Sequence, residues 1–194
     1  MPLILRLAPL PIFAAAVLFS EALLADDPAF ERVSMKLALL SSRQAEPGSV
    51  ILFSPDEVDA WVRTRVPARF PGIRAPKLVL GTGNVTGSAR IDFNQVLAAE
   101  GQPLNPALER LFEGEHPVRI VARIESSGGQ AVVSPTRVEV SGIAATGPML
   151  DLLVKTFLLP LFPDAKIGQP FEWDFGIDRV DVRPDGVRVA IKKR

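Results

Sequence analysis

VRIVARIESSGGQAVVSPTRVEV, residues 118–140, is the most clearly patterned part of this 194-residue chain. In its first half every second position is apolar, and these positions are Val118, Ile120, Ala122 and Ile124. Gly128-Gly129 then favours a tight turn, and the alternation resumes at Val138 and Val140. An alternation of this kind places apolar side chains on one face and polar ones on the other, so it predicts an antiparallel hairpin with one buried face.

Strand patterns also precede this hairpin. Lys77–Thr82 and Val85–Phe93 lie on either side of Gly83-Asn84, which is a turn signal between two apolar runs. Val50–Phe53 is a short apolar run bounded by polar residues, and we expect a further strand there.

The C-terminal part continues the strand pattern. Trp173, Phe175 and Ile177 alternate as a strand, and a change of parity predicts a β-bulge near Asp178. Pro184-Asp185-Gly186 then predicts a turn, because proline and glycine suit the backbone angles that turns need. The last strand is expected to bury Val187, Val189 and Ile191.

Helix signals lie mainly in the first third of the chain. Asp27 followed by proline predicts a helix start, and this first helix is expected to fade between Gln44 and Gly48. Ser54 and Glu57 have the spacing of a capping box, in which each side chain bonds the backbone N–H of the other. This second helix is expected to end at Pro67.

The sum of these patterns is an α+β fold. Helices come first, and an antiparallel, strongly bent sheet of about five or six strands follows, with helices packed on one face of the sheet. One of these later helices is capped by Asn105 and stopped by Gly114. Residues 26–194 are expected to form one α+β domain.

Residues 1–25 have the pattern of an export signal. An apolar run, Leu7–Phe19, follows Arg6 and precedes small residues up to Ala25, and two aspartates come next. The run is shorter than the roughly 20 apolar residues that span a bilayer. We therefore expect a periplasmic or otherwise extracytoplasmic protein, with a membrane-anchored protein whose N-terminal segment is uncleaved, or a helix buried in the core, as alternatives.

Composition excludes several classes of site. The formal net charge is zero, which argues against nucleic acid as a partner. The chain has no cysteine, no tyrosine and a single histidine, His116. Thiol chemistry is therefore excluded, and common acid–base groups are nearly absent. The sequence nominates no catalytic residue, no metal site and no cofactor, and we expect a protein that is not an enzyme.

A basic segment extends from Trp61 to Arg90 and contains six cations and no acid. Arginines beside aromatic residues suit phosphates and lipid headgroups, so the segment predicts an anion-binding surface that contacts an anionic membrane. The candidate anion-binding residues are Arg63, Arg65, Arg69 and Arg74. The alternative is a solvated face whose charges are balanced by acids elsewhere in the chain.

The most apolar segment of the mature chain is Met149–Phe162, whose only charges are Asp151 and Lys155. A helix there is apolar nearly all round, which predicts either a central core helix or the wall of a cavity for an acyl chain. The candidate ligand-binding residues are Leu150, Leu153, Val154, Phe157 and Leu158.

The order of elements resembles small exported bacterial lipid-binding proteins of the tubular lipid-binding (TULIP-like) type. The matching parts are Phe53–Val58 before a helix, the long hairpins, the helix Pro148–Leu159 and the closing segment Val180–Val189. The resemblance covers roughly residues 54–194, and it implies a strongly bent sheet that surrounds helices and encloses apolar ligands. It transfers no individual site residue.

Three functional hypotheses follow, in order of preference. The first is an exported envelope protein that binds a lipid or another apolar ligand without catalysis. The second is an envelope assembly or interaction module with a solid core and no ligand. The third is a hydrolase that uses a pair of carboxylates. Ligand identity and oligomeric state do not follow from the sequence.

Overall fold

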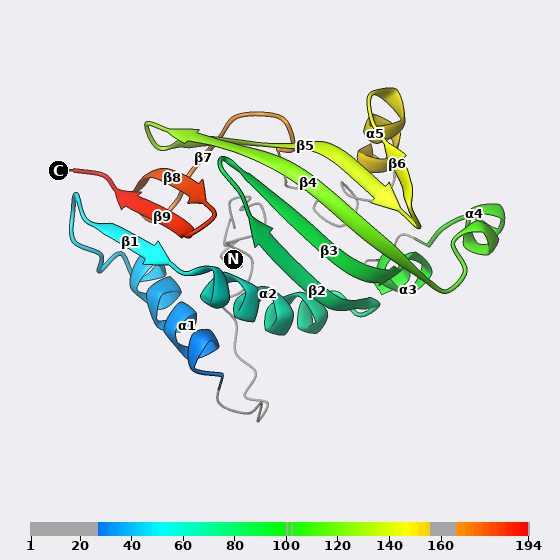
Figure 1. The fold of residues 1–194 in the computed structure, drawn as a ribbon, viewed down its shortest axis with the longest axis horizontal. Helices are drawn as coiled ribbons and strands as arrows, with labels where there is room; N and C mark the ends of the chain where they lie inside the picture. The colour runs from blue at the N-terminus through cyan, green and yellow to red at the C-terminus, as the bar shows by residue number, and fades with distance from the viewer. Residues whose placement is uncertain (1–26, 100, 102, 156–165, 194) are drawn as a thin grey trace, which may run out of the picture.

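The structure, a computed structural model, describes residues 27–99, 101, 103–155 and 166–193. The expected export signal, residues 1–25, therefore lies outside the described residues. The α+β class and the antiparallel pairing are confirmed, but the strands form two sheets instead of one, with six and three strands and no closure into a barrel. The molecule is elongated, with the small sheet near one end and the large sheet extending to the other (Figure 1).

The six-stranded sheet contains both predicted hairpins. Its main path is β2-β3-β4-β5-β6, and a further short strand, β7, pairs with β5. The bounds are β2 Ile73–Leu80, β3 Asn84–Asp92, β4 Glu115–Ser127, β5 Gln130–Val140, β6 Ile143–Ala145 and β7 Phe171–Glu172. The patterned stretch 118–140 forms the β4–β5 hairpin in the middle of this sheet, as its alternation predicts.

The three-stranded sheet joins distant parts of the chain in the order β1-β9-β8. Its strands are β1 Val50–Phe53, β8 Ile177–Arg183 and β9 Gly186–Ile191. The predicted bulge is confirmed as a register shift between Ile177 and Arg179, and the turn at Pro184-Asp185 connects Arg183 to its partner Gly186.

The strand expected across Trp173–Ile177 is wrong in its N-terminal half. Phe175 and Gly176 have φ values of 58° and 73°, so the backbone turns there before β8 begins. The chain before this turn pairs with β5 instead, through Phe171 and Glu172. A turn can bury two apolar side chains, here Trp173 and Ile177, with the same spacing as a strand. The alternation of apolar residues alone therefore did not distinguish the two.

The bounds of the helices are α1 Pro28–Ser41, α2 Pro55–Arg69, α3 Phe93–Ala99, α4 Pro106–Leu111 and α5 Pro148–Leu153. Four of the five described helices begin at the predicted residues, but α3 begins at Phe93, which was expected to end a strand, and α1 ends at Ser41, before the predicted Gln44. The capping box of α2 is present, with Ser54 N donating to Glu57 and Glu57 N donating to Ser54 Oγ. Pro67 does not end α2, which continues to Arg69, because a proline in the last turn removes only one hydrogen bond of the helix.

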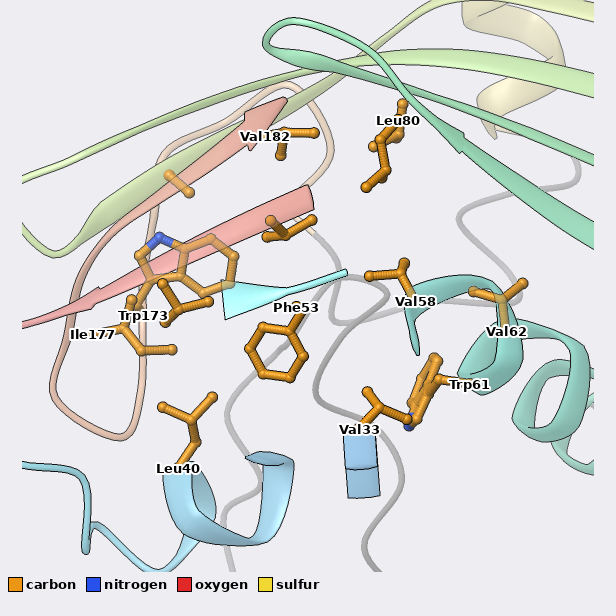
Figure 2. Packing of buried hydrophobic residues seen from close by; sticks show 14 of the residues in the cluster. Val33, Leu40, Phe53, Val58, Trp61, Val62, Leu80, Trp173, Ile177 and Val182 are labelled. Carbon is orange, nitrogen blue, oxygen red and sulfur yellow. The ribbon is translucent and has the colours of Figure 1, made fainter. Parts of the chain in front are cut away.

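The main core lies where α1, α2 and the small sheet meet the large sheet. Phe53, at the end of β1, is 2% exposed and is among the largest fully buried side chains. Figure 2 shows its ring among Val33 and Leu40 of α1 and Val58 of α2, with Trp173 nearby. A second, smaller cluster lies farther along the large sheet, around α3, and contains Phe93, Leu97 and Val118.

Ser126 of β4 connects the two sheets by hydrogen bonds. Its Oγ accepts from Trp173 Nε1 at 2.8 Å and from the backbone N–H of Val180 in β8 at 2.9 Å. The neighbouring turn adds backbone bonds, since Gly129 N donates to Asp178 O and Trp173 N donates to Gly129 O. The small sheet is thus fixed against the β4–β5 end of the large one.

Glu57 is a buried charge that connects α1 to α2. Its side chain is 3% exposed, and its carboxylate accepts from Lys36 Nζ at 2.7 Å and from Arg32 Nε at 3.3 Å, both on α1. Burial raises the pKa of this carboxyl, but the hydrogen bonds from Lys36 and from Ser54 N and the charge of Lys36 outweigh burial, so the pKa lies below its ordinary value of 4.5.

We expect Glu57→Gln to destabilise the protein by about 2 kcal/mol, because the change removes the negative charge that Lys36 and Arg32 share, although glutamine can still cap the helix. Because the folded-state pKa of Glu57 is lowered, its contribution is fully present above pH 4.5 and is lost as the pH falls through the folded-state value. The measurement is urea denaturation of parent and variant between neutral pH and acid.

The matched control is Glu46→Gln, in the exposed loop between α1 and β1, which should change the free energy of unfolding little at any pH. A gap between parent and Glu57→Gln that stays constant down to the lowest measurable pH would contradict the role of the ionised carboxylate.

We expect Ser126→Ala to cost about 1–3 kcal/mol, because the indole N–H of Trp173 and the backbone N–H of Val180 lose their shared acceptor in a partly buried place. Thermal unfolding followed by tryptophan fluorescence measures this loss. Ser127→Ala, at the neighbouring exposed position, is the control and should unfold like the parent. Equal stability of the two variants would show that this contact does not fix the small sheet.

Candidate functional site

One face of the six-stranded sheet is apolar along much of its length. Residues that are direct partners in antiparallel strands point to the same face, so the register defines rows of side chains across the sheet. Three successive rows are Leu80–Val85–Ala122–Pro135, Leu78–Gly87–Ile120–Val138–Ala145 and Ala89–Val118–Val140–Ile143. These rows, hereafter the apolar face, contain no charged residue.

The two hydrophobic clusters cover opposite ends of the apolar face. Val85 and Ala122 of the first row belong to the main core, and Val118 of the third row belongs to the cluster around α3. Leu78 and Ile120 of the middle row are half-buried, and they pack against different clusters. The boundary between the two hydrophobic clusters therefore lies along the middle row.

Gly87 is the second of the five residues of this middle row, between Leu78 and Ile120. It is a residue of β3, which has neighbours on both sides, and its φ is not among the positive values of the chain's glycines. A Cβ at Gly87 would have one neighbour within 4 Å in the part of the chain that the structure describes, Leu78 Cδ1 at 3.8 Å. Neither the backbone conformation nor a close described neighbour requires a glycine there.

His116 marks the end of the apolar face nearest α3 and α4. Its Nδ1 lies 3.0 Å from Ser141 Oγ, and its ring centroid is 6.0 Å from that of Phe93 and 5.8 Å from that of Phe112. His116 Nε2 is buried, with no hydrogen-bond partner among the described residues. A catalytic serine needs a histidine whose second ring nitrogen is held by an acid. Among the described residues, no acid bonds His116 Nε2.

The positive φ of Ser141, 51°, follows from its place in a turn. Ser141 and Gly142 connect the partners Val140 and Ile143, and Gly142 has a φ of 82°. Positive φ at both residues is the requirement of a tight two-residue hairpin turn. The Ser141 conformation is therefore explained by the turn alone.

The ligand-binding residues expected from the sequence lie on or after α5. This helix packs beside β5 and β6, next to the second and third rows of the apolar face. Leu150 is buried and Val154 is half-buried. The side chain of Leu153 and all of Phe157 and Leu158 lie outside what the structure describes, so the ligand role of this segment stays a prediction.

Two of the four candidate anion-binding arginines form ion pairs. Arg63 lies 3.0 Å from Asp59 and 3.4 Å from Asp27, and Arg74 lies 3.0 Å from Glu115. Glu115 also pairs with Arg90 at 3.1 Å. These carboxylates come from outside the basic segment or from the acidic start of α2.

The other two arginines lie over aromatic rings. The guanidinium of Arg65 is 5.2 Å from the ring centre of Phe30, and that of Arg69 is 4.8 Å from the ring centre of Phe70. Together with the ion pairs, this arrangement supports the alternative of a balanced, solvated face. Anion binding by the four residues stays a prediction. We expect the protein to attach to anionic vesicles and the attachment to weaken as salt is added.

Carboxylate chemistry gains no support from the described residues. Glu57 is the one buried charged residue among them, and its oxygens are occupied by Lys36, Arg32 and Ser54 N. The described part of the chain also holds no group of three or more histidines, cysteines or acids that could bind a metal. Among the same residues, no helix has both the length and the apolar character to cross a membrane.

Sequence reasoning did not single out Gly87. The signal was the alternation of Val85, Gly87, Ala89 and Ile91, which places a glycine on the buried face of a strand. The alternation indicates that Gly87 faces the apolar side, but only the register shows that it lies in the central row.

Comparison of the chain with protein-family models, with curated proteins and with solved structures finds no match.

Proposed function

We propose that this protein binds a lipid or another elongated apolar ligand on the apolar face, without catalysis. The observation that carries the proposal is Gly87, a glycine in the middle of an interior strand, facing the apolar side. A glycine inside a strand costs roughly 0.5–1 kcal/mol relative to alanine. It commonly marks a place where a ligand or another backbone approaches the sheet closely.

Other residues with small side chains lie near Gly87 on the apolar face. Ala122 is diagonal to it in the first row, Ala89 lies two residues along β3, and Ala145 ends the middle row. Larger residues, Leu78 and Ile120, are its direct cross-strand partners. The proposed ligand lies along these small side chains, and each methylene buried there contributes about 0.8 kcal/mol.

Two expectations from the sequence favour a lipid as the ligand. Export, predicted from residues 1–25, would bring the protein to an envelope in which lipids pass through water between membranes. The resemblance to TULIP-like proteins implies a sheet that encloses apolar ligands. A neutral chain with no nominated catalytic residue agrees with binding in place of chemistry.

We expect Gly87→Val to weaken binding of a fluorescently labelled long-chain fatty acid by about tenfold or more, because the added methyl groups occupy the space beside the strand that the ligand would take. The same change should leave the melting temperature equal or raise it, because valine suits a strand better than glycine does. Fluorescence titration and thermal melting of the same preparations measure the two effects.

The matched control is Ser88→Val, the next residue of β3, whose side chain lies on the opposite face of the sheet and is exposed. It should bind the fatty acid like the parent. A Gly87→Val protein that melts well below the parent would mean that the space is already filled by protein. That result, with no fatty-acid binding by the parent, would favour the interaction module with a solid core.

A further inference from the structure

The helix α4 and the residues that flank it, 103–113, lie at the end of the molecule beyond α3 (Figure 1). We call these residues the α4 segment. No residue of α4 itself is buried, whereas Leu104 and Phe112, on either side of the helix, are half-buried and pack against the cluster around α3. A segment that buries little apolar surface opens locally at a low cost in free energy.

Phe112 and Glu109 attach the α4 segment to α3 and to the start of β4. The ring centre of Phe112 lies 5.1 Å from that of Phe93 and 5.8 Å from that of His116. Asn94 of α3 donates from Nδ2 to the backbone oxygen of Glu109 at 2.9 Å. Outward movement of the segment breaks these contacts, and they are what the closed arrangement gains.

Two residues that the α4 segment contacts have buried polar atoms without a partner. His116 Nε2 and Asn94 Oδ1 are both buried, and neither has a hydrogen-bond partner among the residues that the structure describes. Buried polar groups in proteins are nearly always hydrogen-bonded, so each of these atoms adds a cost to the closed arrangement. His116 also belongs to the apolar face, because its strand partner Ile91 lies four residues after Gly87 on β3.

Glycines with positive φ lie at both ends of the α4 segment. Gly101 has a φ of 73° and Gly114 has a φ of 83°, and a Cβ at either position would have nothing within 4 Å. Glycine changes between such backbone angles and negative ones without a steric cost. Gly114 directly precedes Glu115, the first residue of β4, so the chain can change direction there while the sheet stays in place.

We propose that the α4 segment is a lid, which opens away from α3 and β4 and exposes His116 Nε2 and the neighbouring end of the apolar face. In the open state water bonds His116 Nε2 and Asn94 Oδ1, and in the closed state Phe112 regains its packing, so the two states are close in free energy. The opening stands on these contacts. Its use as the entrance for the ligand rests on the proposed function.

The two ends of the apolar face supply a matched pair of reporter positions. Val85 in the first row and Val118 in the third row are each 7% exposed. Val85 belongs to the main core under the small sheet, whereas Val118 lies two residues after His116 in the cluster that Phe112 packs against. The lid therefore predicts that Val118 becomes accessible by local opening and Val85 only by unfolding of the core.

The experiment is alkylation by iodoacetamide of Val118→Cys and of Val85→Cys, each made separately in the full chain. The chain has no cysteine of its own, so each variant has one thiol and reports on one position. We expect Val118→Cys to react about tenfold faster than Val85→Cys or more, because local opening is more frequent than unfolding of the main core.

Second substitutions in the Val118→Cys protein identify the segment that opens. Phe112→Ala should raise the alkylation rate by about tenfold, because it removes packing that only the closed lid has. His116→Leu should lower the rate, because leucine leaves no buried nitrogen for water to bond. The control is Leu111→Ala, whose side chain is 67% exposed, and it should leave the rate unchanged. Phe112→Ala in the Val85→Cys protein should also leave the slow rate unchanged.

Equal, slow alkylation of Val118→Cys and Val85→Cys would overturn the lid. So would fast alkylation of Val118→Cys that neither Phe112→Ala nor His116→Leu changes, since another segment would then be the one that opens.

Stopped-flow mixing with the labelled fatty acid tests the entrance separately. Association should be faster in Phe112→Ala and slower in His116→Leu than in the parent, and rates equal to that of the parent in both would reject the entrance. A lid that opens in a parent that binds no fatty acid would support the lid and reject the proposed ligand.

Discussion

A long apolar sheet face must be covered, and the way this chain covers it determines the arrangement of the other elements. At one end the cover is the small sheet with α1 and α2, fixed through Ser126 and through Gly83, whose N–H donates to Val182 O. At the other end the cover is α3 and its neighbours around Phe93. Between them the middle row is mixed: Val138 and Ala145 are buried, whereas a Cβ at Gly87 would have one described neighbour within 4 Å.

Polar groups of α1 and α2 stabilise the covered end in two places. The Glu57 carboxylate connects the helices to each other, because a buried charge is tolerated only when it is paired and hydrogen-bonded. Asp59, two residues later, accepts from the backbone N–H of Leu78 at 3.2 Å and so satisfies part of the free edge of β2. That contact protects an edge strand from pairing with another chain. The same helix therefore packs the core and closes the sheet.

The sequence predicted what depends on local chemistry. The capping box of Ser54 and Glu57, the β4–β5 hairpin and the bulge after Ile177 all follow from spacing within a few residues. It did not predict the partners of Glu57, because Lys36 is 21 residues away and no short-range pattern connects them. The division into two sheets was missed for the same reason, since β1 and β9 come from opposite ends of the described chain. The candidate site depends on register, which alternation within one strand does not specify.

The distribution of side-chain size gives the two ends of the large sheet different roles. Where the small sheet covers it, large buried side chains such as Phe53 and Trp173 pack over small ones such as Ala122. In the middle row Gly87 and Ala145 lie among the larger Leu78, Ile120 and Val138, and at the β6 edge Ile143 is 70% exposed. Natural selection for stability alone would fill the middle and make the edge polar, since both changes are easy and favourable. The proposed ligand, lying beside Gly87, gives a reason for a glycine in the middle of the face, where stability alone favours a larger side chain.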